Sequence, residues 1–596
     1  MQLFENVLAD ASTWCRTSTT RDWVTITRRV EHEGLSFLTI TLPSFCQDFE
    51  RSLEEGRVDP SHFRGFSRCG ALPRFLGGLL GLVFDPCTGV LLNSADVHAV
   101  FAIRQICLLA KKVLLPCSGE RERKAYDAYV QCESELSQVQ TTLPKDLFET
   151  FRDVSCLLWG SSLQGVQQAL LEGELVPRHG PGSTADRILG NQKYEFKQWN
   201  ERLQPFFPAD QYVIPNLGWT DDLQDIEFTE PGAEIPVKVI SVPKTLKSPR
   251  IIAMEPLCMQ YAQQSLLQLL VEALEKSYLT RRKVNFTRQK PNQRLARMAS
   301  STGRLATLDM KEASDRVSAF LVDSMLESVP FLRDAIFACR STKSDVPGYG
   351  VLTLTKFASM GSALCFPIEA MMFYTVAILC GLKSKGLRPT LKNIKKCSRG
   401  VRVYGDDIII PIEMVQSYCE LLEAFGLRVN FHKSFWTGKF RESCGSDFYS
   451  GIAVNPVYCR RIGPSSKRDA SEILSWISMS NLFYEKGYWK SAQFCRDWVE
   501  SLRIPLPIVE ADSPVKGRLS YTFGYVAERV CPNLHRPLVK GVVVRALPRT
   551  SIIDGRAALL KCLLKQGLEP FADKRHLERH GRPDCVDINI RWAVPY

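Results

Sequence analysis

The sequence lacks the patterns that mark several common classes of protein. It contains twenty cysteines but no C-x-x-C pair, and the two closest in sequence, Cys107 and Cys117, are ten residues apart. This spacing fits neither a zinc-binding framework nor a disulfide-dense secreted scaffold, so we expect reduced thiols in a cytosol. The first residues, MQLFENVLADAS, contain no basic region followed by an apolar run, so we expect no signal peptide.

Internal repeats, low-complexity tracts and a clear membrane span are also absent from the sequence. One long apolar run, from Ser362 to Leu382, contains Glu369, carries Pro367 in its first turns and has no basic flank immediately before it. These interruptions favour a buried helix of a large soluble core over a membrane-spanning helix.

What the sequence does contain is a modest excess of basic residues. Lysine and arginine total 76 against 64 acidic residues, which gives a net charge of +12 and a pI near 8.8. An excess of basic residues is typical of a protein that holds a polyanion. Because this excess is modest, the basic residues must be gathered into channels. A hydrophobic content of 45% over 596 residues predicts three or four subdomains.

The most informative segment is VRVYGDDIII, residues 401–410. Its β-branched residues predict two strands, and Gly405-Asp406 predicts the turn between them. Asp406 and Asp407 would then lie side by side at the tip of a hairpin, an arrangement best tolerated when a divalent cation lies between the two charges. A bare GDD is most often an exposed turn, but the apolar flanks favour a site here.

A third acidic candidate is Asp309, in RLATLDMKEASDRVS. Leu305, Thr307 and Leu308 predict a short strand, and Asp309 follows it directly. Two Mg²⁺ ions about 3.5–4 Å apart need two or three such carboxylates. An aspartate at the end of a strand is usually structural, so Asp309 is a candidate ligand only in combination with the other carboxylates. Asp315 follows beyond a turn that can fold back beside it.

The segment ASMGSALCFPIEAMMF carries a loop and the start of a helix. Ser359-Met360-Gly361 predicts a loop, and the helix is expected to begin near Ser362. Glycine in such a loop permits a close approach of the backbone to a ligand. Taken alone, the signal is weak.

A basic loop is predicted in VKVISVPKTLKSPRIIAMEP. Lys244, Lys247 and Arg250 recur every third residue, and Pro243 and Pro249 stiffen the segment. Three cations so close together suit a triphosphate or a nucleic-acid backbone. The alternative is a basic loop that only faces solvent.

The order of these motifs and the residues within them resemble those of a known family. The segments VPKTLKSPRIIAMEP, TLDMKEASDRVS, ASMGSALCFPIEAMMF, VYGDDIIIP and FRESCGSDFYSGIAVNPVY resemble the replicase β-subunit of the single-stranded RNA bacteriophages. The resemblance covers roughly residues 237–460. It implies template-dependent RNA synthesis by two-metal nucleotidyl transfer.

The resemblance also implies roles for individual residues. Asp309 and Asp406 would be the main ligands of two Mg²⁺ ions (Mn²⁺ is also possible), with Asp407 as a nearby auxiliary ligand. Lys433, in LRVNFHKSF, would donate a proton to the departing pyrophosphate. Its alternative is a surface lysine at the end of a strand.

Further residues would contact the incoming nucleotide. Asp315 would accept a hydrogen bond from the ribose 2′-OH, although it is also a candidate cap for a helix beginning near Arg316. Ser359 and Gly361 would shape the pocket around the ribose and the templating base. The residues expected to line the nucleotide access path and neutralise the triphosphate are Lys244, Lys247 and Arg250.

The fold implied by the resemblance is α+β, a right-hand polymerase with fingers, palm and thumb, whose palm is an antiparallel sheet packed on helices. The expected division is an N-terminal and fingers-side region (1–235), a basic fingers segment (236–302), the palm (303–460), and a thumb and C-terminal region (461–596). The implied partners are template and product RNA, nucleoside triphosphates, the host translation elongation factors Tu and Ts and a ribosomal RNA-binding protein. The implied location is the cytoplasm of a bacterial host, with no membrane.

Two other classes of function remain open at the level of the motifs. A reverse transcriptase shares the carboxylates and the tyrosine before them, but usually has a bulky aromatic residue where Asp315 stands. A catalytically inactive, RNA-binding palm is the second alternative, and the presence of all the candidate carboxylates argues against it.

Three smaller features also have two interpretations. RESCGSDFYSG, residues 441–451, suggests a metal site through Arg441, Glu442 and Cys444, but structural support of the hairpin is favoured. RHGPGSTADR, residues 178–187, is a plain turn or a phosphate cradle. The basic stretch from Lys574-Arg575-His576 to Arg591 either contacts RNA or faces solvent.

Overall fold

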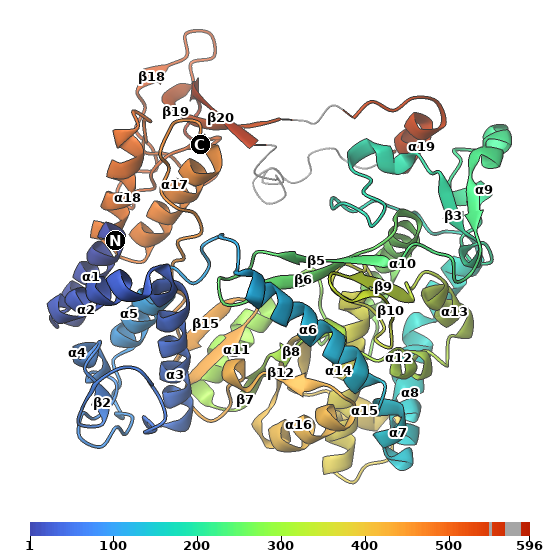
Figure 1. Cartoon of the computed structure of the whole chain (residues 1–596), viewed down its shortest axis with the longest axis horizontal. Coiled ribbons are helices and arrows are strands. Elements are labelled where there is room, and N and C mark those ends of the chain that lie inside the picture. The colour runs from blue at the N-terminus through green and yellow to red at the C-terminus, as the bar shows by residue number, and fades with distance from the viewer. Residues whose placement is uncertain (548–550, 567–585) are drawn as a thin grey trace.

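The protein is described from a computed structural model that covers residues 1–547, 551–566 and 586–596 (Figure 1). Most of the basic stretch beginning at Lys574 therefore lies outside the described residues, and only its end at Arg591 falls within a strand. The described chain mixes helices with small, mostly antiparallel sheets, so the predicted α+β class is confirmed.

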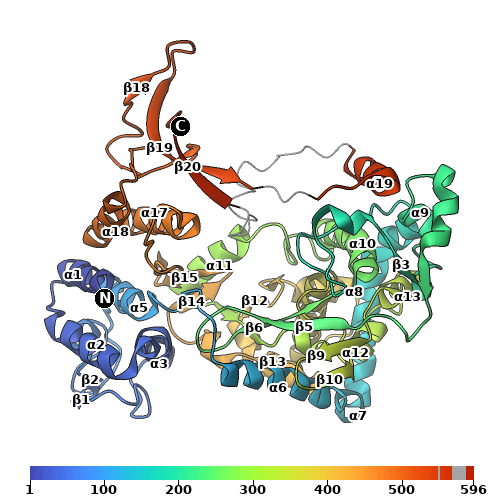
Figure 2. The ribbon, with the colours of Figure 1, turned by 45° about the horizontal axis from the view of Figure 1, so that its top comes forward.

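One large hydrophobic core is built from both ends of the chain. It buries side chains of the N-terminal helices together with those of two helices near the C-terminus, which pack beside one another in both views (Figures 1 and 2). The principal helices of this core are α1 (Gln2–Cys15), α3 (Leu42–Glu55), α5 (Val97–Leu108), α17 (Ala470–Glu485) and α18 (Trp489–Ser501).

Hydrogen bonds tie the two ends of the chain together inside this core. The carboxylate of Asp10, on α1, accepts bonds from the backbone N–H of Lys490 (3.1 Å) and Ser491 (2.9 Å) and from the Ser491 hydroxyl (2.7 Å). These backbone groups belong to the first turn of α18, whose N–H groups have no partner within the helix. Asp10 therefore caps a helix 480 residues away in sequence.

The second large core surrounds helix α14 (Cys365–Ser384), nearly all of whose side chains are buried. It packs against α8 (Lys145–Leu171), α10 (Leu257–Lys276) and α16 (Val415–Ala424). α14 is the single described helix that is long and apolar enough to cross a membrane, and 89% of its apolar window lies inside the protein. The prediction of a buried core helix is confirmed, and it begins at Cys365, three residues later than expected.

The predicted hairpin supplies two strands of a three-stranded antiparallel sheet in the order β11-β12-β7, with β12 at its centre. Its strands are β11 (Arg402–Tyr404), β12 (Asp407–Pro411) and β7 (Leu305–Leu308). Side chains alternate between the faces of a strand. Ile408 and Ile410 accordingly join the α14 core, whereas Ile409 packs with Ala299 of helix α11 (Lys290–Thr302) on the other face. The predicted antiparallel sheet packed on helices is thus present.

The basic loop lies at the tip of a second antiparallel hairpin, β5 (Val237–Val242) and β6 (Arg250–Met254). This hairpin belongs to a four-stranded sheet in the order β10-β9-β5-β6, with β9 (Lys343–Val346) and β10 (Gly350–Thr353). Helix α6 (Gly119–Leu136) packs against β6. Arg121, on α6, donates to the carbonyl of Leu246 (2.7 Å) and so braces the basic loop.

The C-terminal part of the chain reaches across the molecule. Strands β19 (Pro537–Ala546) and β20 (Val586–Ala593) pair next to α17, whereas α19 (Gly555–Lys565) lies on the opposite side (Figures 1 and 2). There Arg556 donates to the carbonyls of Asp222 (2.7 Å) and Phe196 (3.1 Å).

The remaining helices are shorter or connect these units: α2 (Thr20–Glu33), α4 (Gly77–Leu80), α7 (Val139–Thr142), α9 (Ala209–Tyr212), α12 (Ala319–Met325), α13 (Pro330–Ala338) and α15 (Leu391–Cys397). The remaining strands are β1 (Arg68–Cys69), β2 (Leu72–Pro73), β3 (Gln198–Asn200), β4 (Glu227–Thr229), β8 (Met310–Lys311), β13 (Arg428–Val429), β14 (Phe440–Ser443), β15 (Ser446–Tyr449), β16 (Ile452–Ala453), β17 (Val515–Lys516) and β18 (Arg529–Val530).

Candidate active site

The hairpin between β11 and β12 has a two-residue turn that requires glycine. Tyr404 pairs with Asp407, which leaves Gly405 and Asp406 as the turn. Gly405 has φ +58°, and a Cβ atom placed there would lie 1.9 Å from the ring of Phe366. A positive φ at the first turn position is favourable for glycine and strained for other residues. The ring of Phe366 therefore fixes the hairpin tip against the start of α14.

The strand register brings the third carboxylate to the same place. β12 pairs with β7 so that Ile408 is opposite Leu308, and one further step along this register places Asp407 opposite Asp309. Opposite residues of an antiparallel pair have Cα atoms about 4.5–5.5 Å apart. Two carboxylates that are 98 residues apart in sequence therefore meet at one end of the sheet, beside Asp406.

The electrostatics of the three carboxylates follow from this crowding. Burial and the charge of Asp309 raise the pKa of Asp406, against the opposing effect of Lys433 and Lys244. The pKa of Asp407 is raised to about 6, mainly by burial, while a hydrogen bond from the Cys444 backbone lowers it and the other two aspartates raise it further. The protein alone thus leaves negative charge at the site incompletely neutralised, which a bound cation would relieve.

Asp309 is held by a turn that the sequence did not single out. Asn430 donates from Nδ2 to Asp309 Oδ2 (2.8 Å), and the Asp309 backbone N–H donates to Ser434 Oγ (3.1 Å). Lys433 Nζ lies 3.6 Å from the same Oδ2. Burial lowers the pKa of Lys433, but the carboxylates of Asp309, Glu442 and Asp406 raise it above its ordinary value. Lys433 is therefore a charged ammonium group at the carboxylate cluster.

The hairpin β14–β15 supports the site from behind. Arg441 is fully buried and donates to the carbonyls of Leu305 (2.8 Å), Gly438 (2.7 Å) and Trp436 (2.8 Å). Its role is to tie the hairpin to β7, in agreement with the favoured structural interpretation of this segment. From the same hairpin, Ser443 Oγ donates to Asp407 Oδ1 (3.4 Å).

Asp315 lies in a buried ion-pair network. Lys356, which has no exposed side-chain surface, bonds Asp315 Oδ1 (3.0 Å) and Glu133 Oε1 (3.1 Å). Its Nζ also lies 3.5 Å from the centroid of the Tyr129 ring, and the Tyr129 hydroxyl bonds Ser359 Oγ (2.9 Å). Two predicted nucleotide-contacting residues, Asp315 and Ser359, are thus connected through Lys356 and Tyr129. None of the three supporting residues was identified from the sequence.

The alternative that Asp315 caps a helix is wrong. Asp315 lies within a short 3₁₀ turn, Ser314–Arg316, and the next helix, α12, begins at Ala319 with Ser318 at its N-cap. The Asp315 and Asp406 carboxylates both raise the pKa of Glu369, next to the effect of its burial in α14. Asp315 therefore belongs to the same charged region as the hairpin.

The SMG loop packs on the basic hairpin. The backbone N–H of Ala253, in β6, donates to the Met360 carbonyl (2.9 Å). Gly361 has φ +137°, and a Cβ there would lie 1.8 Å from the carbonyl oxygen of Ala253. Glycine fits here because it has no Cβ atom, so the two backbones can meet.

The three cations of the basic loop differ in their positions. The pKa of Lys244 is lowered by burial and by the neighbouring charges of Arg250 and Lys433, with Asp309 and Asp406 acting in the opposite direction. Lys244 therefore faces the carboxylate cluster, and Arg250 lies beside it at the start of β6. All three side chains are exposed, but no described contact brings Lys247 to the carboxylates.

The donor set suits a hard divalent cation, because all three candidate ligands are carboxylates at one sheet edge. Within the described ranges, no three His, Cys, Asp or Glu side chains are already gathered as metal ligands. One reason is that Asp309 Oδ2 is engaged by Asn430 and Lys433. A cation would have to compete with these two contacts.

The other glycine-rich candidate, residues 178–187, uses its carbonyls within the protein. Lys193 donates from Nζ to the carbonyl of Gly180 (2.7 Å) and also bonds that of Gly182. His179 stacks on Tyr261 with ring centroids 4.5 Å apart, and burial lowers its pKa to about 3. This geometry is that of a packed turn.

The part of the chain that carries the site is similar to known proteins. Residues 231–467, which contain every site residue named above except Glu133 and Tyr129, match the family model described as RNA replicase, beta-chain. The chain is 33% identical over 359 residues to the RNA-directed RNA polymerase subunit beta of Qbeta virus strain MX1, covering 58% of this chain and 57% of that one. It is 29% identical over 359 residues to the same subunit of Enterobacteria phage SP, covering 58% of each.

A third relative, the RNA-directed RNA polymerase beta chain of Escherichia phage MS2, is 34% identical over 223 residues, which cover 37% of each chain. The matches with phages SP and Qbeta MX1 span a little over half the length of those relatives. Over the matched residues, the resemblance to the phage replicase β-subunits is confirmed.

Two solved structures are similar at low sequence identity. The RNA-dependent RNA polymerase of a human picobirnavirus matches with TM-score 0.31 and 13% identity, covering 45% of this chain and 57% of that one. The polymerase of BmCPV at its elongation state matches with TM-score 0.36 and 11% identity, covering 69% and 38%.

Proposed function

We propose that this chain catalyses template-dependent RNA synthesis, in which the 3′-hydroxyl of a growing strand attacks the α-phosphate of a nucleoside triphosphate. The observation that carries the proposal is the meeting of Asp309 with Asp406 and Asp407 on adjacent strands. These strands lie within the part of the chain that matches phage replicase β-subunits. Replication of a viral RNA genome in the cytoplasm of an infected bacterium is the setting that these relatives support.

The proposed roles of the site residues follow their positions. Asp309, Asp406 and Asp407 would hold two Mg²⁺ ions, with Mn²⁺ as a possible substitute. When bound, such ions lower the pKa of the attacking hydroxyl and offset the charge of the leaving pyrophosphate. Lys433 already lies as an ammonium group next to Asp309 and is placed to donate a proton to the pyrophosphate.

The nucleotide would lie between the carboxylates and the basic hairpin. Lys244 and Arg250 would face its triphosphate, with Lys247 further out along the access path. Asp315 would accept a hydrogen bond from the 2′-OH. Ser359 would line the ribose pocket, and Gly361 would hold that pocket against β6. In this proposal residues 303–460 are the palm, 236–302 and part of 1–235 the fingers, and 461–596 the thumb.

The test is synthesis by the purified chain from an RNA template and nucleoside triphosphates with Mg²⁺. Asp406→Asn should abolish synthesis and leave RNA binding nearly intact, because an amide cannot hold the cation as a carboxylate does. Asp210→Asn, at an exposed aspartate of α9, is the matched control and should behave like the parent chain. Equal loss of synthesis and RNA binding in Asp406→Asn would instead indicate a folding defect.

The two alternative functions are distinguished in the same assay. Preferred incorporation of deoxynucleotides on the RNA template would identify a reverse transcriptase. Absence of any synthesis by the parent chain, even when it is purified together with its host proteins and retains RNA binding, would identify an inactive palm.

We further propose that the chain works with host proteins, namely elongation factors Tu and Ts and a ribosomal RNA-binding protein. The relatives are named as subunits or chains designated beta, which supports an assembly of several chains. Purification from a bacterial host should recover such proteins with the chain. Full-rate copying of its RNA by the isolated chain would exclude obligatory host subunits.

A further inference from the structure

A group of unpaired cations lies on the loop between α10 and α11 and on the first turns of α11. All are exposed, and none of their side chains has a carboxylate or hydrogen-bond partner among residues 1–547, 551–566 and 586–596. We call this group the groove cations: Arg281, Arg282, Arg288, Lys290 and Arg294.

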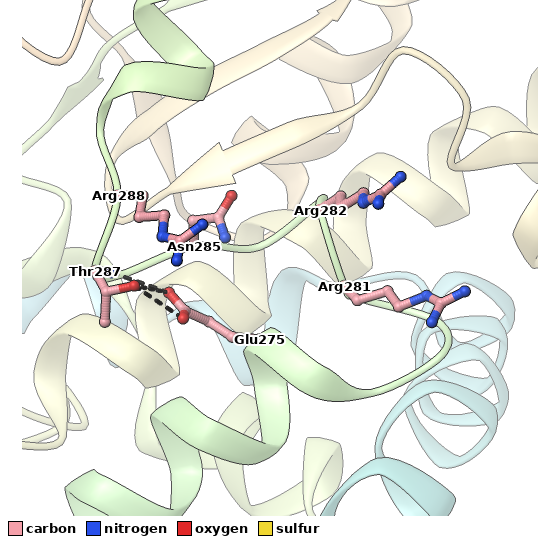
Figure 3. A pocket seen from close by; sticks show the side chains of 6 residues that line it. All are labelled: Glu275, Arg281, Arg282, Asn285, Thr287 and Arg288. Atoms are coloured by element: carbon pink, nitrogen blue, oxygen red, sulfur yellow. Dashed lines mark hydrogen bonds between the residues drawn. The ribbon is translucent and has the colours of Figure 1, made fainter.

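The groove cations line two adjoining cavities that share Thr287 and Arg288 as a common wall. The first has a volume of ≈ 400 Å³ and is lined by Arg281, Arg282 and Arg288 (Figure 3). The second has a volume of ≈ 800 Å³ and continues along the first turns of α11 to Tyr404. Together they form an elongated groove that ends at the hairpin carrying Asp406.

The one acidic residue in the groove is used to build the loop. Glu275 accepts hydrogen bonds from the backbone N–H of Phe286 (2.7 Å) and Thr287 (2.9 Å) and from the Thr287 hydroxyl (Figure 3). Burial raises the pKa of Glu275, but these bonds lower it below its ordinary value, so the group is ionised. The carboxylate therefore fixes the turn and forms no ion pair with the groove cations.

Two local features indicate a positive potential at the groove. Burial and the charges of Arg402 and Arg399 lower the pKa of the adjacent Lys283. The N-terminus of α11 lacks a side-chain cap, so its free N–H groups add to the positive potential along the second cavity.

The groove is attached rigidly to the catalytic hairpin. The Val403 N–H donates to the Lys283 carbonyl (2.8 Å), and the Asn285 N–H donates to the Val403 carbonyl (3.1 Å). Gln289 Nε2 lies 3.4 Å from the hydroxyl of Tyr404. The loop thus extends the sheet edge at β11, on the strand that leads directly into Gly405 and Asp406.

We propose that the groove cations bind the sugar–phosphate backbone of the RNA strand that lies next to the catalytic hairpin. This inference deepens the proposed function by assigning a second substrate-binding surface, separate from the Lys244 loop. A row of exposed arginines and backbone N–H groups suits consecutive phosphates better than a single triphosphate, because the charges are spread along two cavities. Tyr404 at the end of the groove offers a ring and a hydroxyl to the nucleotide nearest the carboxylates.

The test compares three variants in the Asp406→Asn background, without nucleotides, so that its outcome does not depend on synthesis. The groove variant combines Arg282→Gln, Arg288→Gln and Arg294→Gln. The control variant removes the same charge from exposed residues in and before α15, through Arg388→Gln, Lys392→Gln and Lys396→Gln. A third variant replaces the three groove arginines with lysine. Thermal unfolding checks that all three fold.

Affinity for a short single-stranded RNA is measured over a range of salt concentrations. The groove variant should bind about tenfold more weakly or worse, and the slope of log K against log salt should fall by about 2, as expected for three lost phosphate contacts. The lysine variant should keep the slope. Equal affinity and slope in the groove and control variants would overturn the proposal. So would a loss of binding to free ATP with unchanged binding to RNA.

Discussion

The two large hydrophobic cores of this chain are assembled in different ways. The core around α14 is formed almost entirely by residues 132–429, and the sheet that carries Asp309, Asp406 and Asp407 rests on it. The other core joins residues 3–113 to residues 435–506. The first is largely continuous in sequence, whereas the second exists only when the two ends of the chain meet.

Each core contains a buried cation between two carboxylates. The contacts of these two cations differ between the cores. Arg104, in the second core, bonds Glu50 (2.8 Å) and Asp447 (2.9 Å), and its Nη1 also bonds the Val454 carbonyl. These contacts join α3 and α5 to the hairpin behind the active site. Lys356, in contrast, holds Asp315, a residue of the proposed nucleotide site. A similar ion pair network joins secondary-structure elements in one core and, in our proposal, holds a nucleotide-contacting residue in the other.

The largest effect is expected from breaking the ion network of the second core. Arg104→Met should lower the free energy of unfolding by about 3–5 kcal/mol, because two buried carboxylates lose their cation. Denaturant unfolding measures this loss. The molecules that remain folded should synthesise RNA at the parent rate per active site.

A matched control is available on the neighbouring helix α3. Arg51 pairs with Glu55 on the surface (2.7 Å), and Arg51→Met should change the free energy of unfolding by no more than about 0.5 kcal/mol. If Arg104→Met were as mild as this control, the second core would not depend on its ion network.

A change at the hairpin tip should instead affect catalysis first. Gly405→Ala places a methyl group against the ring of Phe366 at a positive φ, so the tip must shift. Misplacement of a catalytic group by about 1 Å costs roughly 10²-fold in rate, and synthesis should fall by about that factor. The measurement is single-turnover nucleotide addition.

Two companion variants isolate the cause. Gly303 also has a positive φ, of +64°, but nothing lies within 4 Å of its added Cβ. Gly303→Ala should therefore cost about 1 kcal/mol of stability with little change in rate. Adding Phe366→Leu to Gly405→Ala should restore part of the lost activity. An unimproved double variant would show that backbone strain alone causes the defect.

The choice between ribose and deoxyribose tests the Lys356 network. Asp315→Ala should slow ribonucleotide use and narrow the gap to deoxynucleotides by roughly one to two powers of ten, which corresponds to about 1–3 kcal/mol. The ratio of kcat/KM for the two sugars is the measurement. If Asp315 serves only to neutralise Lys356, thermal stability will fall and this ratio will not change.

The hairpin between β11 and β12 was predictable because the residues that determine it are neighbours in the sequence. Apolar β-branched residues on both sides of Gly405-Asp406 predict strands, and α14 is apolar along its whole length. The proximity of Asp309 to the hairpin was inferred through a family resemblance, and the register that places it opposite Asp407 came only from the structure, since nothing in a spacing of 98 residues dictates it. Gly361 was predicted to shape the nucleotide pocket, and this stays a prediction; the structure adds a close contact of Gly361 with the backbone of Ala253, which the sequence did not indicate.

The supporting residues could not be predicted for a physical reason. Glu133 and Lys356 are 223 residues apart, and a lysine in a sequence carries no sign that it is buried. The groove cations, in contrast, could have been identified from the sequence. Residues 281–297 contain seven lysines and arginines and no acidic residue, and this run is visible without a structure.

The smallest effect is expected from a buried acid in the second core, and it should appear as a dependence of stability on pH. Asp22 is buried and accepts a hydrogen bond from the Leu76 backbone N–H (2.6 Å). Burial raises its pKa to about 6, against the lowering effect of that bond. Between about pH 4 and pH 6 the folded protein therefore binds more protons at this site than the unfolded chain, so stability should decrease as the pH rises.

Asp22→Asn keeps an oxygen that can accept the Leu76 bond and removes the charge. It should stabilise the protein by about 1–2 kcal/mol at pH 7, have little effect near pH 4, and remove this part of the pH dependence. Thermal unfolding of both proteins from pH 4 to pH 7 measures the difference. Because Asp22 lies in the core that supports architecture, RNA synthesis should not change. Parallel stability curves would show that Asp22 is ionised in the folded protein without penalty, and a loss of synthesis would show that the two cores are less separate in function than their packing indicates.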